Sequence, residues 1–183
     1  MCGLQSVAQW STCKGAGPMV KCFIIQNPTK GAVFMADYIF RKATDADMPV
    51  IMDMQVSVFH GEQGIPAEDI KMSKKENQQW FCVEHQGEVI GSVAGWTEDG
   101  KTHMGRFVIR PDLRRQGIGK KLVRLAFETL MDQGVEEFFM EGRDATVDLV
   151  CSFGGEKTGE PFKFFNGNCT PLYLHRDNYI PEK

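Results

Sequence analysis

The sequence contains no hydrophobic run long enough to cross a membrane. Its longest apolar stretches, Cys22 to Ile25 and Ala32 to Ala36, are far shorter than the ~20 residues that a spanning helix needs. The N-terminus also lacks the apolar core and the small-residue cleavage site of a signal peptide. We therefore expect a cytoplasmic protein that has no membrane partner.

Metal-binding patterns and a strong net charge are missing as well. The six cysteines form no C-x-x-C pair and no Cys/His spacing typical of a zinc site, so we expect reduced thiols and no bound metal. Lys and Arg number 21 and Asp and Glu 24, which gives a net charge of -3. Because this balance attracts neither nucleic acid nor anionic lipid, we expect no nucleic-acid partner and a local site for any anionic ligand.

The length of 183 residues suits one folded domain with an appendage, and we expect a monomer or a homodimer. Residues 1–36 show no clear period and mix Gly, Ser, Thr and Pro, so we predict a loosely ordered N-terminal extension there. Regular patterns begin near Met35. They predict a folded domain over residues 37–183.

Patterns along this domain predict alternating strands and helices. Asp45 is expected to cap a helix whose apolar positions are Val50, Ile51, Met54 and Val58. In chain order, we predict a strand at 38–42, this helix, a shorter helix at 66–75, strands at 80–84, 89–96 and 102–109, a helix at 117–133, a strand at 135–141, a helix at 145–153 and two strands around Asn166-Gly167. This order predicts a mixed α/β domain with a central sheet covered by helices.

Basic residues gather between positions 101 and 124, where eight Lys and Arg accompany a single acid, Asp112. In this segment "RRQGIGKK" places Gly117 and Gly119 where a loop becomes the first turn of a helix. The first N–H groups of a helix have no partner within it, and the helix dipole is positive at the same end. Several such donors with flanking cations suit a pyrophosphate better than a single carboxylate.

Arg114-x-x-Gly117-x-Gly119, preceded by the strand "RFVI" and followed by a long amphipathic helix, resembles the Q/R-x-x-G-x-G/A acetyl-CoA motif of the GNAT acetyltransferases. The order of elements also resembles theirs, from about Tyr38 to the C-terminus. The resemblance implies a mostly antiparallel sheet that splays at an acetyl-CoA site, with acetyl-CoA as the acyl donor. The residues that it assigns to acetyl-CoA are Phe107, Val108, Ile109, Arg114, Arg115, Gln116, Gly117, Ile118, Gly119 and Lys120.

The same resemblance implies a reaction. In GNAT proteins the pantetheine arm lies in the gap like an added strand, so main-chain groups of residues 107–109 would bond to it here, and the Ile109 N–H would stabilise the oxyanion. The implied activity is transfer of acetyl to a primary amine of a small molecule by direct attack. A protein or peptide acceptor and a non-catalytic acyl-CoA-binding module remain alternatives.

Direct attack needs a base, because a protonated amine has no lone pair. His103 is our first candidate, since it lies on the strand that enters the motif, at the position of the glutamate base of histone-type members, and imidazole titrates near neutral pH. Glu62, in a loop expected near the acceptor, and Glu141, at the end of the strand across the gap, are alternatives. On the acid side, Val150 stands where many relatives carry Tyr.

Two further segments match known patterns. "VSVFHGEQGIPAED", from Val56 to Asp69, resembles the V-F-x-x-E-Q-G-I-P segment of a bacterial GNAT subgroup, without the usual Arg before the Val-Phe pair. Gly95 to Thr102 matches the phosphate-loop pattern G-x-x-x-x-G-K-[ST], which requires a helix directly afterwards. "HMGRFVI" is strand-like instead, and Asp99-Gly100 is typical of a hairpin turn, so we do not expect a nucleotide-hydrolysing enzyme.

Overall fold

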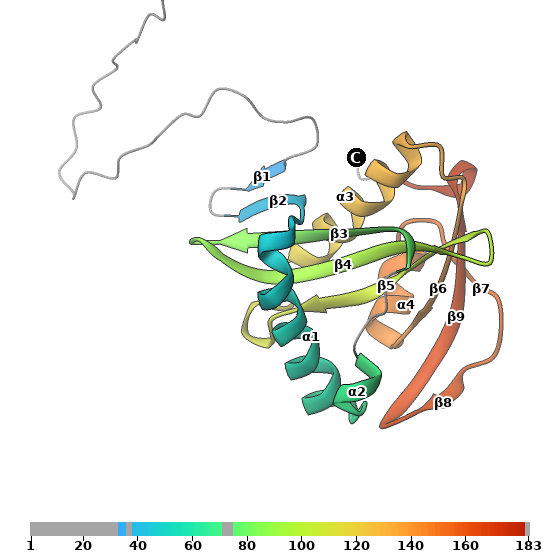
Figure 1. The fold of residues 1–183 in the computed structure, drawn as a ribbon. Helices are drawn as coiled ribbons and strands as arrows, with labels where there is room; N and C mark the ends of the chain where they lie inside the picture. The colour runs from blue at the N-terminus through green and yellow to red at the C-terminus, as the bar shows by residue number, and fades with distance from the viewer. Residues whose placement is uncertain (1–32, 36–37, 71–74, 182–183) are drawn as a thin grey trace, which may run out of the picture.

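The computed structural model describes residues 33–35, 38–70 and 75–181 (Figure 1). The strands are β1 (Val33–Met35), β2 (Tyr38–Lys42), β3 (Glu76–His85), β4 (Glu88–Glu98), β5 (Lys101–Ile109), β6 (Glu137–Gly142), β7 (Glu156–Lys157), β8 (Phe162–Phe164) and β9 (Gly167–His175). The helices are α1 (Met48–Gln63), α2 (Ala67–Ile70), α3 (Ile118–Asp132) and α4 (Asp144–Cys151). Within these residues no helix is long and apolar enough to cross a bilayer.

The strands form one sheet in the order β1-β2-β3-β4-β5-β6-β9-β7, with β8 paired to β9. Every neighbouring pair is antiparallel except β5 and β6. Those two strands are in register at one described position, where His103 faces Phe139. Beyond that point β5 and β6 separate, which confirms the prediction of a mixed, mostly antiparallel sheet that opens beside β5.

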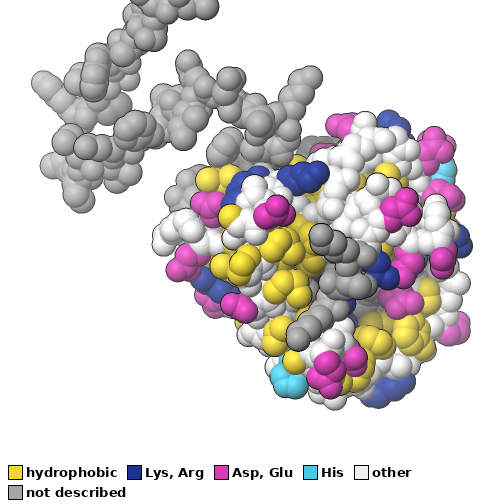
Figure 2. All heavy atoms as spheres, viewed as in Figure 1, with side chains coloured by type: hydrophobic (Ala, Val, Ile, Leu, Met, Phe, Trp, Pro, Cys, Tyr) yellow, Lys and Arg dark blue, Asp and Glu magenta, His cyan; other side chains and the backbone are white. Residues whose placement is uncertain are grey.

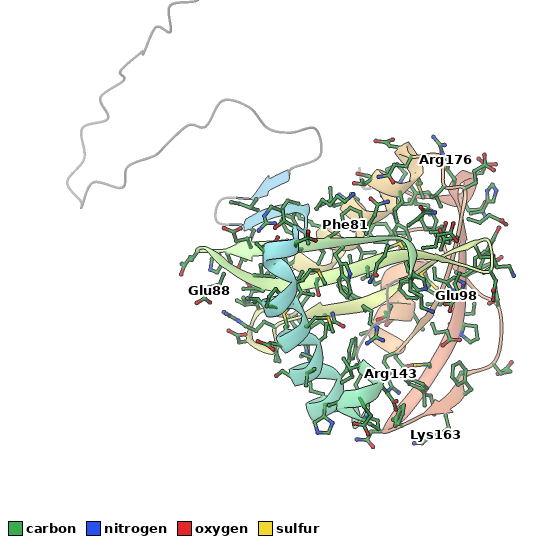
Figure 3. The ribbon with its side chains drawn as sticks, viewed as in Figure 1. Phe81, Glu88, Glu98, Arg143, Lys163 and Arg176 are labelled. Carbon is green, nitrogen blue, oxygen red and sulfur yellow. The ribbon has the colours of Figure 1, made fainter. Side chains whose placement is uncertain are left out.

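Helices cover both faces of the sheet. Successive side chains of β3 point to opposite faces, and apolar side chains on both faces have to be buried. Trp80 and Cys82 pack with Ile51 of α1 on one face. Phe81 and Val83 point to the other face and pack in the cluster that contains the apolar side of α3 (Figures 1 and 3). The apolar stripe predicted for α3 is buried throughout, at Ile118, Leu122, Leu125, Ala126, Leu130 and Met131.

The apolar face of α1 differs from the prediction. Val50 is 49% exposed, whereas Gln55 is fully buried and stands in line with Ile51 and Val58. Hydrophobic side chains therefore show on the surface over α1 in Figure 2. A polar residue in the buried stripe indicates that α1 does more than cover the core.

Element ends also differ from the predicted ones. Strand β1 pairs with β2 ahead of the predicted domain boundary at residue 37, while residues 1–32, predicted to be loosely ordered, lie outside the described residues. The helix predicted at 66–75 is the four-residue α2, and residues 71–74 are not described. Val135 was expected to start a strand, but its N–H donates to Leu130 O at 3.1 Å and completes the end of α3.

The segment that matches the phosphate-loop pattern forms a hairpin. Glu98 pairs with Lys101, and the two residues between them, Asp99 and Gly100, have φ of 51° and 73°. Positive φ at both central residues is the geometry of a tight hairpin turn. Because β5 and not a helix follows the turn, the expectation of a hairpin is confirmed.

The start of α1 is fixed to the sheet by a charged group. Arg41 of β2 donates to both oxygens of Asp47, at 2.7 and 2.9 Å, and the Thr44 N–H donates to the same carboxylate. The Arg41 guanidinium holds the pKa of Asp47 well below its usual range. Helix α1 is therefore oriented from its first turn, which places its last turn beside the gap in the sheet.

Candidate active site

Strand β5 carries a bulge where it begins to leave β6. Ser92 pairs with Val108 and Ala94 with Gly105, so this stretch of β5 holds one residue more than the facing stretch of β4. Arg106 lies within the bulge at φ 56°, in the left-handed region that few non-glycine residues adopt. A bulge bends its own strand, and here the bend directs β5 away from its parallel neighbour.

A buried amide holds this bulge. Gln55 Nε2 donates to Ser92 Oγ at 2.9 Å and to the Arg106 carbonyl at 2.7 Å. The Gln55 side chain therefore bonds to both strands at the bulge, to Ser92 of β4 and to Arg106 of β5. No sequence pattern indicated a role for Gln55, because a glutamine on a helix is expected to be exposed to solvent unless its partners are known.

Main-chain groups of β5 face the gap. The Arg110 N–H donates to Ile90 O at 2.8 Å, so in the alternating antiparallel pattern the N–H and C=O of Ile109 point to the opposite edge of β5. Arg114 Nε reaches the Ile109 carbonyl at 2.9 Å from that edge. By the same alternation the groups of Val108 point to β4, which leaves Phe107 and Ile109, and not Val108, to bond a ligand in the gap.

The start of α3 is open and has no side-chain cap. Gly117 is its N-cap at φ 76°, no side chain caps the helix, and a Cβ on Gly117 would meet nothing within 4 Å. Gly119 has a different role, because a Cβ there would lie 2.7 Å from Phe107 Cζ. Its small size lets the first turn of α3 approach β5. The first N–H groups of α3 thus point outward beside the gap.

Arg114 and Glu62 form an ion pair with each other. The guanidinium donates to both carboxylate oxygens of Glu62 at 2.8 Å while its Nε holds the Ile109 carbonyl. Glu62 lies in the last turn of α1 and not in a loop, since the helix continues to Gln63 and ends at Gly64 in the left-handed conformation. The ion pair attaches the end of α1 to the loop that contains Arg114, before the start of α3. Neither side chain lines the cavity described below.

The eight cations of the predicted basic cluster do not form one patch. Arg110 pairs with Asp112 and Glu88, so its charge is compensated. The Nη1 of Arg106 donates to the carbonyl of Ile70 at the end of α2, and burial lowers the pKa of Arg106. Arg115 and Lys120 remain next to Gly117 at the start of α3.

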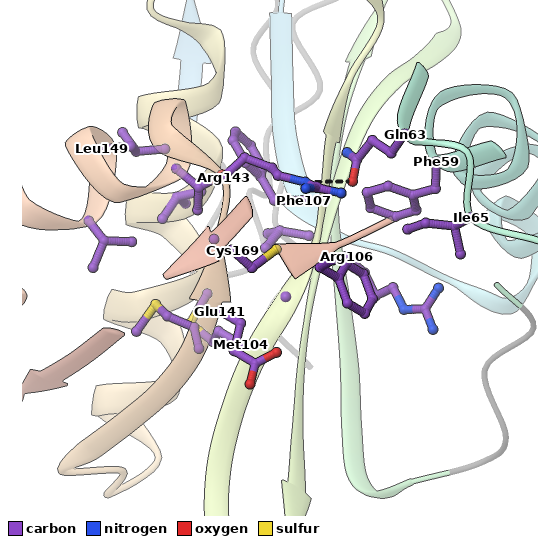
Figure 4. A pocket seen from close by; sticks show the side chains of 18 of the residues that line it. Phe59, Gln63, Ile65, Met104, Arg106, Phe107, Glu141, Arg143, Leu149 and Cys169 are labelled. Atoms are coloured by element: carbon purple, nitrogen blue, oxygen red, sulfur yellow. Dashed lines mark hydrogen bonds between the residues drawn. The ribbon is translucent and has the colours of Figure 1, made fainter. Parts of the chain in front are cut away.

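A cavity of about 490 Å³ opens between the separated strands (Figure 4). Much of its wall is apolar and comes from α1, β5, α3, α4 and the hairpin of β8 and β9. Its charged lining residues are Asp69, Arg106, Glu141 and Arg143. This volume is in the range of small-molecule sites.

The three candidate bases lie in different places. Glu141 lines the cavity, and among the described residues no donor bonds to its carboxylate. His103 stacks between Trp96 and Phe139, with ring centroids 5.9 and 6.0 Å apart, outside the cavity lining. Because Phe139 and Glu141 are two residues apart on β6, His103 shares a sheet face with Glu141 without reaching the cavity.

No tyrosine is among the described cavity residues. Val150, at the position where many relatives carry Tyr, lines the wall. The Tyr173 O–H donates to Glu137 at 2.6 Å, and this carboxylate raises the pKa of Tyr173 to about 12. In the described part of the chain, no three His, Cys, Asp or Glu side chains are grouped to hold a metal.

Comparisons with known proteins agree with this geometry. Residues 48–150 match the model of the acetyltransferase (GNAT) family. No curated protein sequence matches the chain. Similar solved structures include Escherichia coli ElaA, with 16% identity and a TM-score of 0.66 over 76% of this chain and 99% of that one.

Two other similar structures have named acceptors. The spermidine N-acetyltransferase of Vibrio cholerae, in complex with CoA and spermine, shares 16% identity with a TM-score of 0.61 over 79% of this chain and 99% of that one. The ribosomal-protein-S18-alanine N-acetyltransferase of Escherichia coli shares 15% identity with a TM-score of 0.61 over 80% and 97%. At these identities the likeness shows a common fold.

Replacing Gln55 by Leu tests the support of the bulge. The change removes the two hydrogen bonds that Gln55 Nε2 donates and leaves the Arg106 carbonyl and the Ser92 hydroxyl buried without this partner. We therefore expect the free energy of unfolding to fall by about 2 kcal/mol. Urea unfolding measures it, with the exposed Asp53→Ala on the same helix as a control that should change it by less than about 0.5 kcal/mol. A Gln55→Leu protein as stable as the wild type would contradict this role.

Proposed function

The chain belongs to the GNAT acetyltransferase family, and we propose that it transfers the acetyl group of acetyl-CoA to the primary amine of a small molecule. One observation carries the proposal. The Ile109 N–H faces the gap between β5 and β6, next to the uncapped start of α3, and Phe107 of the same strand lines the cavity. A single extended acyl-donor molecule can reach the Ile109 N–H, the start of α3 and the cavity.

The residues present fit acetyl-CoA. Its diphosphate suits the N–H groups after Gly117, with Arg115 and Lys120 beside them, because several donors and cations share two charges. Its pantetheine amides suit the main-chain groups of Phe107 and the Ile109 N–H, since the Ile109 carbonyl already accepts from Arg114. The acetyl oxygen then lies near the Ile109 N–H, which stabilises negative charge as it develops there.

The reaction itself is simple. The amine nitrogen forms a bond to the acetyl carbon, the carbon–sulfur bond breaks, and the electron pair leaves with the CoA sulfur. The nitrogen loses a proton, which we assign to Glu141 through a chain of waters, since this carboxylate lies in the cavity wall. The thiolate takes a proton from solvent.

The volume of the cavity favours a small acceptor over a protein. Its volume of about 490 Å³ suits a metabolite-sized amine beside the acyl group. A peptide N-terminus and a non-catalytic acyl-CoA-binding module are the alternatives, and release of free CoA with a panel of amines and peptides separates the three. The similarity of residues 56–69 to the V-F-x-x-E-Q-G-I-P segment stays a prediction from sequence; in this chain its Glu62 braces Arg114.

Gly117→Glu tests the donor site. Bulk and negative charge at the diphosphate position should weaken acetyl-CoA binding by more than about 100-fold, measured by isothermal titration calorimetry. Gly134→Glu is a matched control, because Gly134 also has positive φ with nothing within 4 Å but lies at the other end of α3. Equal affinities for the two variants would refute the assignment.

Glu141→Gln tests the base. We expect kcat to fall by about 100-fold, most strongly below the pKa of the acceptor amine, while the KM for acetyl-CoA changes little. His103→Gln is the comparison, and the structure predicts a smaller effect for it. If His103→Gln loses the pH-dependent activity and Glu141→Gln keeps it, the base is His103.

A further inference from the structure

Arg143 stands in the cavity wall with part of its hydrogen-bonding capacity unused. Its Nε donates to Gln63 Oε1 at 3.1 Å, its Nη1 is 3.3 Å from Asn168 O, and the guanidinium lies over the Phe164 ring, 5.7 Å from the centroid. Its Nη2 is buried and has no partner among the described residues. The group is held in place from two sides while one donor remains open.

The same guanidinium has no ionic partner. Arg41, Arg110 and Arg114 each pair with carboxylates, whereas no ion pair to Arg143 is found in the described part of the chain. A half-buried cation with a free donor, in a cavity, is complementary to an anionic ligand group. A carboxylate is an organic anion that accepts charge-assisted hydrogen bonds from a guanidinium.

Surrounding backbone fixes the position of Arg143. The Asn166 N–H donates to Gln63 O at 3.2 Å, which joins the β8–β9 turn to the end of α1. A Cβ on Gly167 would lie 2.6 Å from Arg143 Nη1, so the glycine of this turn makes room for the guanidinium. The site is therefore preformed and does not depend on a flexible arm.

Arg143 and Glu141 are close neighbours. Glu141 and Gly142 are the last residues of β6 and Arg143 follows directly, so at ~3.3 Å per strand residue the Cα atoms of Glu141 and Arg143 are about 6.6 Å apart. Cys169 lies between them in Figure 4. Burial raises the pKa of its thiol, while Arg143 lowers it and Glu141 raises it, as expected if both charges are near.

Besides these two residues the cavity lining contains two further charged groups, Asp69 and Arg106, and several apolar side chains. Phe59 and Ile65, from the end of α1 and the loop after it, line the cavity together with Phe164 and Phe165 of the hairpin. These rings suit a hydrophobic side chain. A polyamine, in contrast, would bring its positive charges against the guanidinium of Arg143.

We propose that the acceptor is a free α-amino acid with a hydrophobic side chain. Its carboxylate binds Arg143, its amine points to the Glu141 side, and its side chain packs among the aromatic rings. This assignment rests on the proposed acetyl transfer, because it names the acceptor of the same site. The product is an N-acetylated amino acid.

The test compares three acceptors with wild-type protein and acetyl-CoA. L-phenylalanine carries the carboxylate, L-phenylalaninamide replaces it by a neutral amide that also represents a peptide N-terminus, and 2-phenylethylamine lacks it. We expect kcat/KM for CoA release to be about 100-fold higher with L-phenylalanine than with either analogue. The amide has the less basic amine, so solution chemistry alone favours it, and a preference for the amide, the amine or spermidine would overturn the proposal.

Arg143→Gln identifies the residue responsible. The ratio of kcat/KM for L-phenylalanine to that for the amide should fall toward one, because the variant keeps a donor and loses the charge. Lys163→Gln is the control: Lys163 lies on β8, in the hairpin that lines the cavity, points to the outside (Figure 3), and should leave the ratio unchanged. An unchanged ratio in Arg143→Gln would also overturn the proposal.

Calorimetry separates failure of this proposal from failure of the proposed function. If acetyl-CoA does not bind, the acetyl-transfer function fails first. If it binds and no acceptor releases CoA, L-phenylalanine should still bind the CoA-loaded wild type and not the Arg143→Gln variant. Absence of that binding would contradict the acceptor assignment, whereas turnover of other amines alone would contradict it and leave acetyl transfer in place.

Discussion

Two hydrogen bonds from the buried amide of Gln55 link helix α1 to the bulge in β5. The bulge bends β5 away from β6, its parallel neighbour, and the separation leaves main-chain groups without a strand to pair with. In most sheets such unpaired groups are a liability, because they bind other strands. Here they face a narrow gap with a helix start at one end and a cavity at the other, so they can serve a ligand.

The parts around the gap depend on that separation. Helix α3 packs its apolar stripe against one face of the sheet and brings its uncapped start to the edge of the gap, with Gly119 close to Phe107. On the other face, the Glu62–Arg114 pair and the contact between Gln63 and Arg143 attach the end of α1 to both strands that border the gap. One of these contacts therefore lies beside Ile109 and the other in the wall of the cavity.

Sequence patterns predicted the features that follow local rules. The stripe of α3 and the Asp99-Gly100 hairpin were predictable, because helical period and turn chemistry are properties of neighbouring residues. The roles of Gln55 and Arg143 were not, since their partners lie 25 to 80 residues away and a single sequence does not show which polar residue is buried. Glu141 and His103 could be named as candidates, but only the sheet register shows which of them reaches the cavity.

The central claim is that acetyl-CoA occupies the gap and bonds to the Ile109 N–H. Hydrogen exchange of assigned backbone amides, followed by NMR with and without acetyl-CoA, measures this directly. The account predicts that acetyl-CoA slows exchange at Ile109 and in the first turn of α3, and leaves Gly134, at the far end of that helix, unchanged. Binding of acetyl-CoA with no change at Ile109 would contradict it.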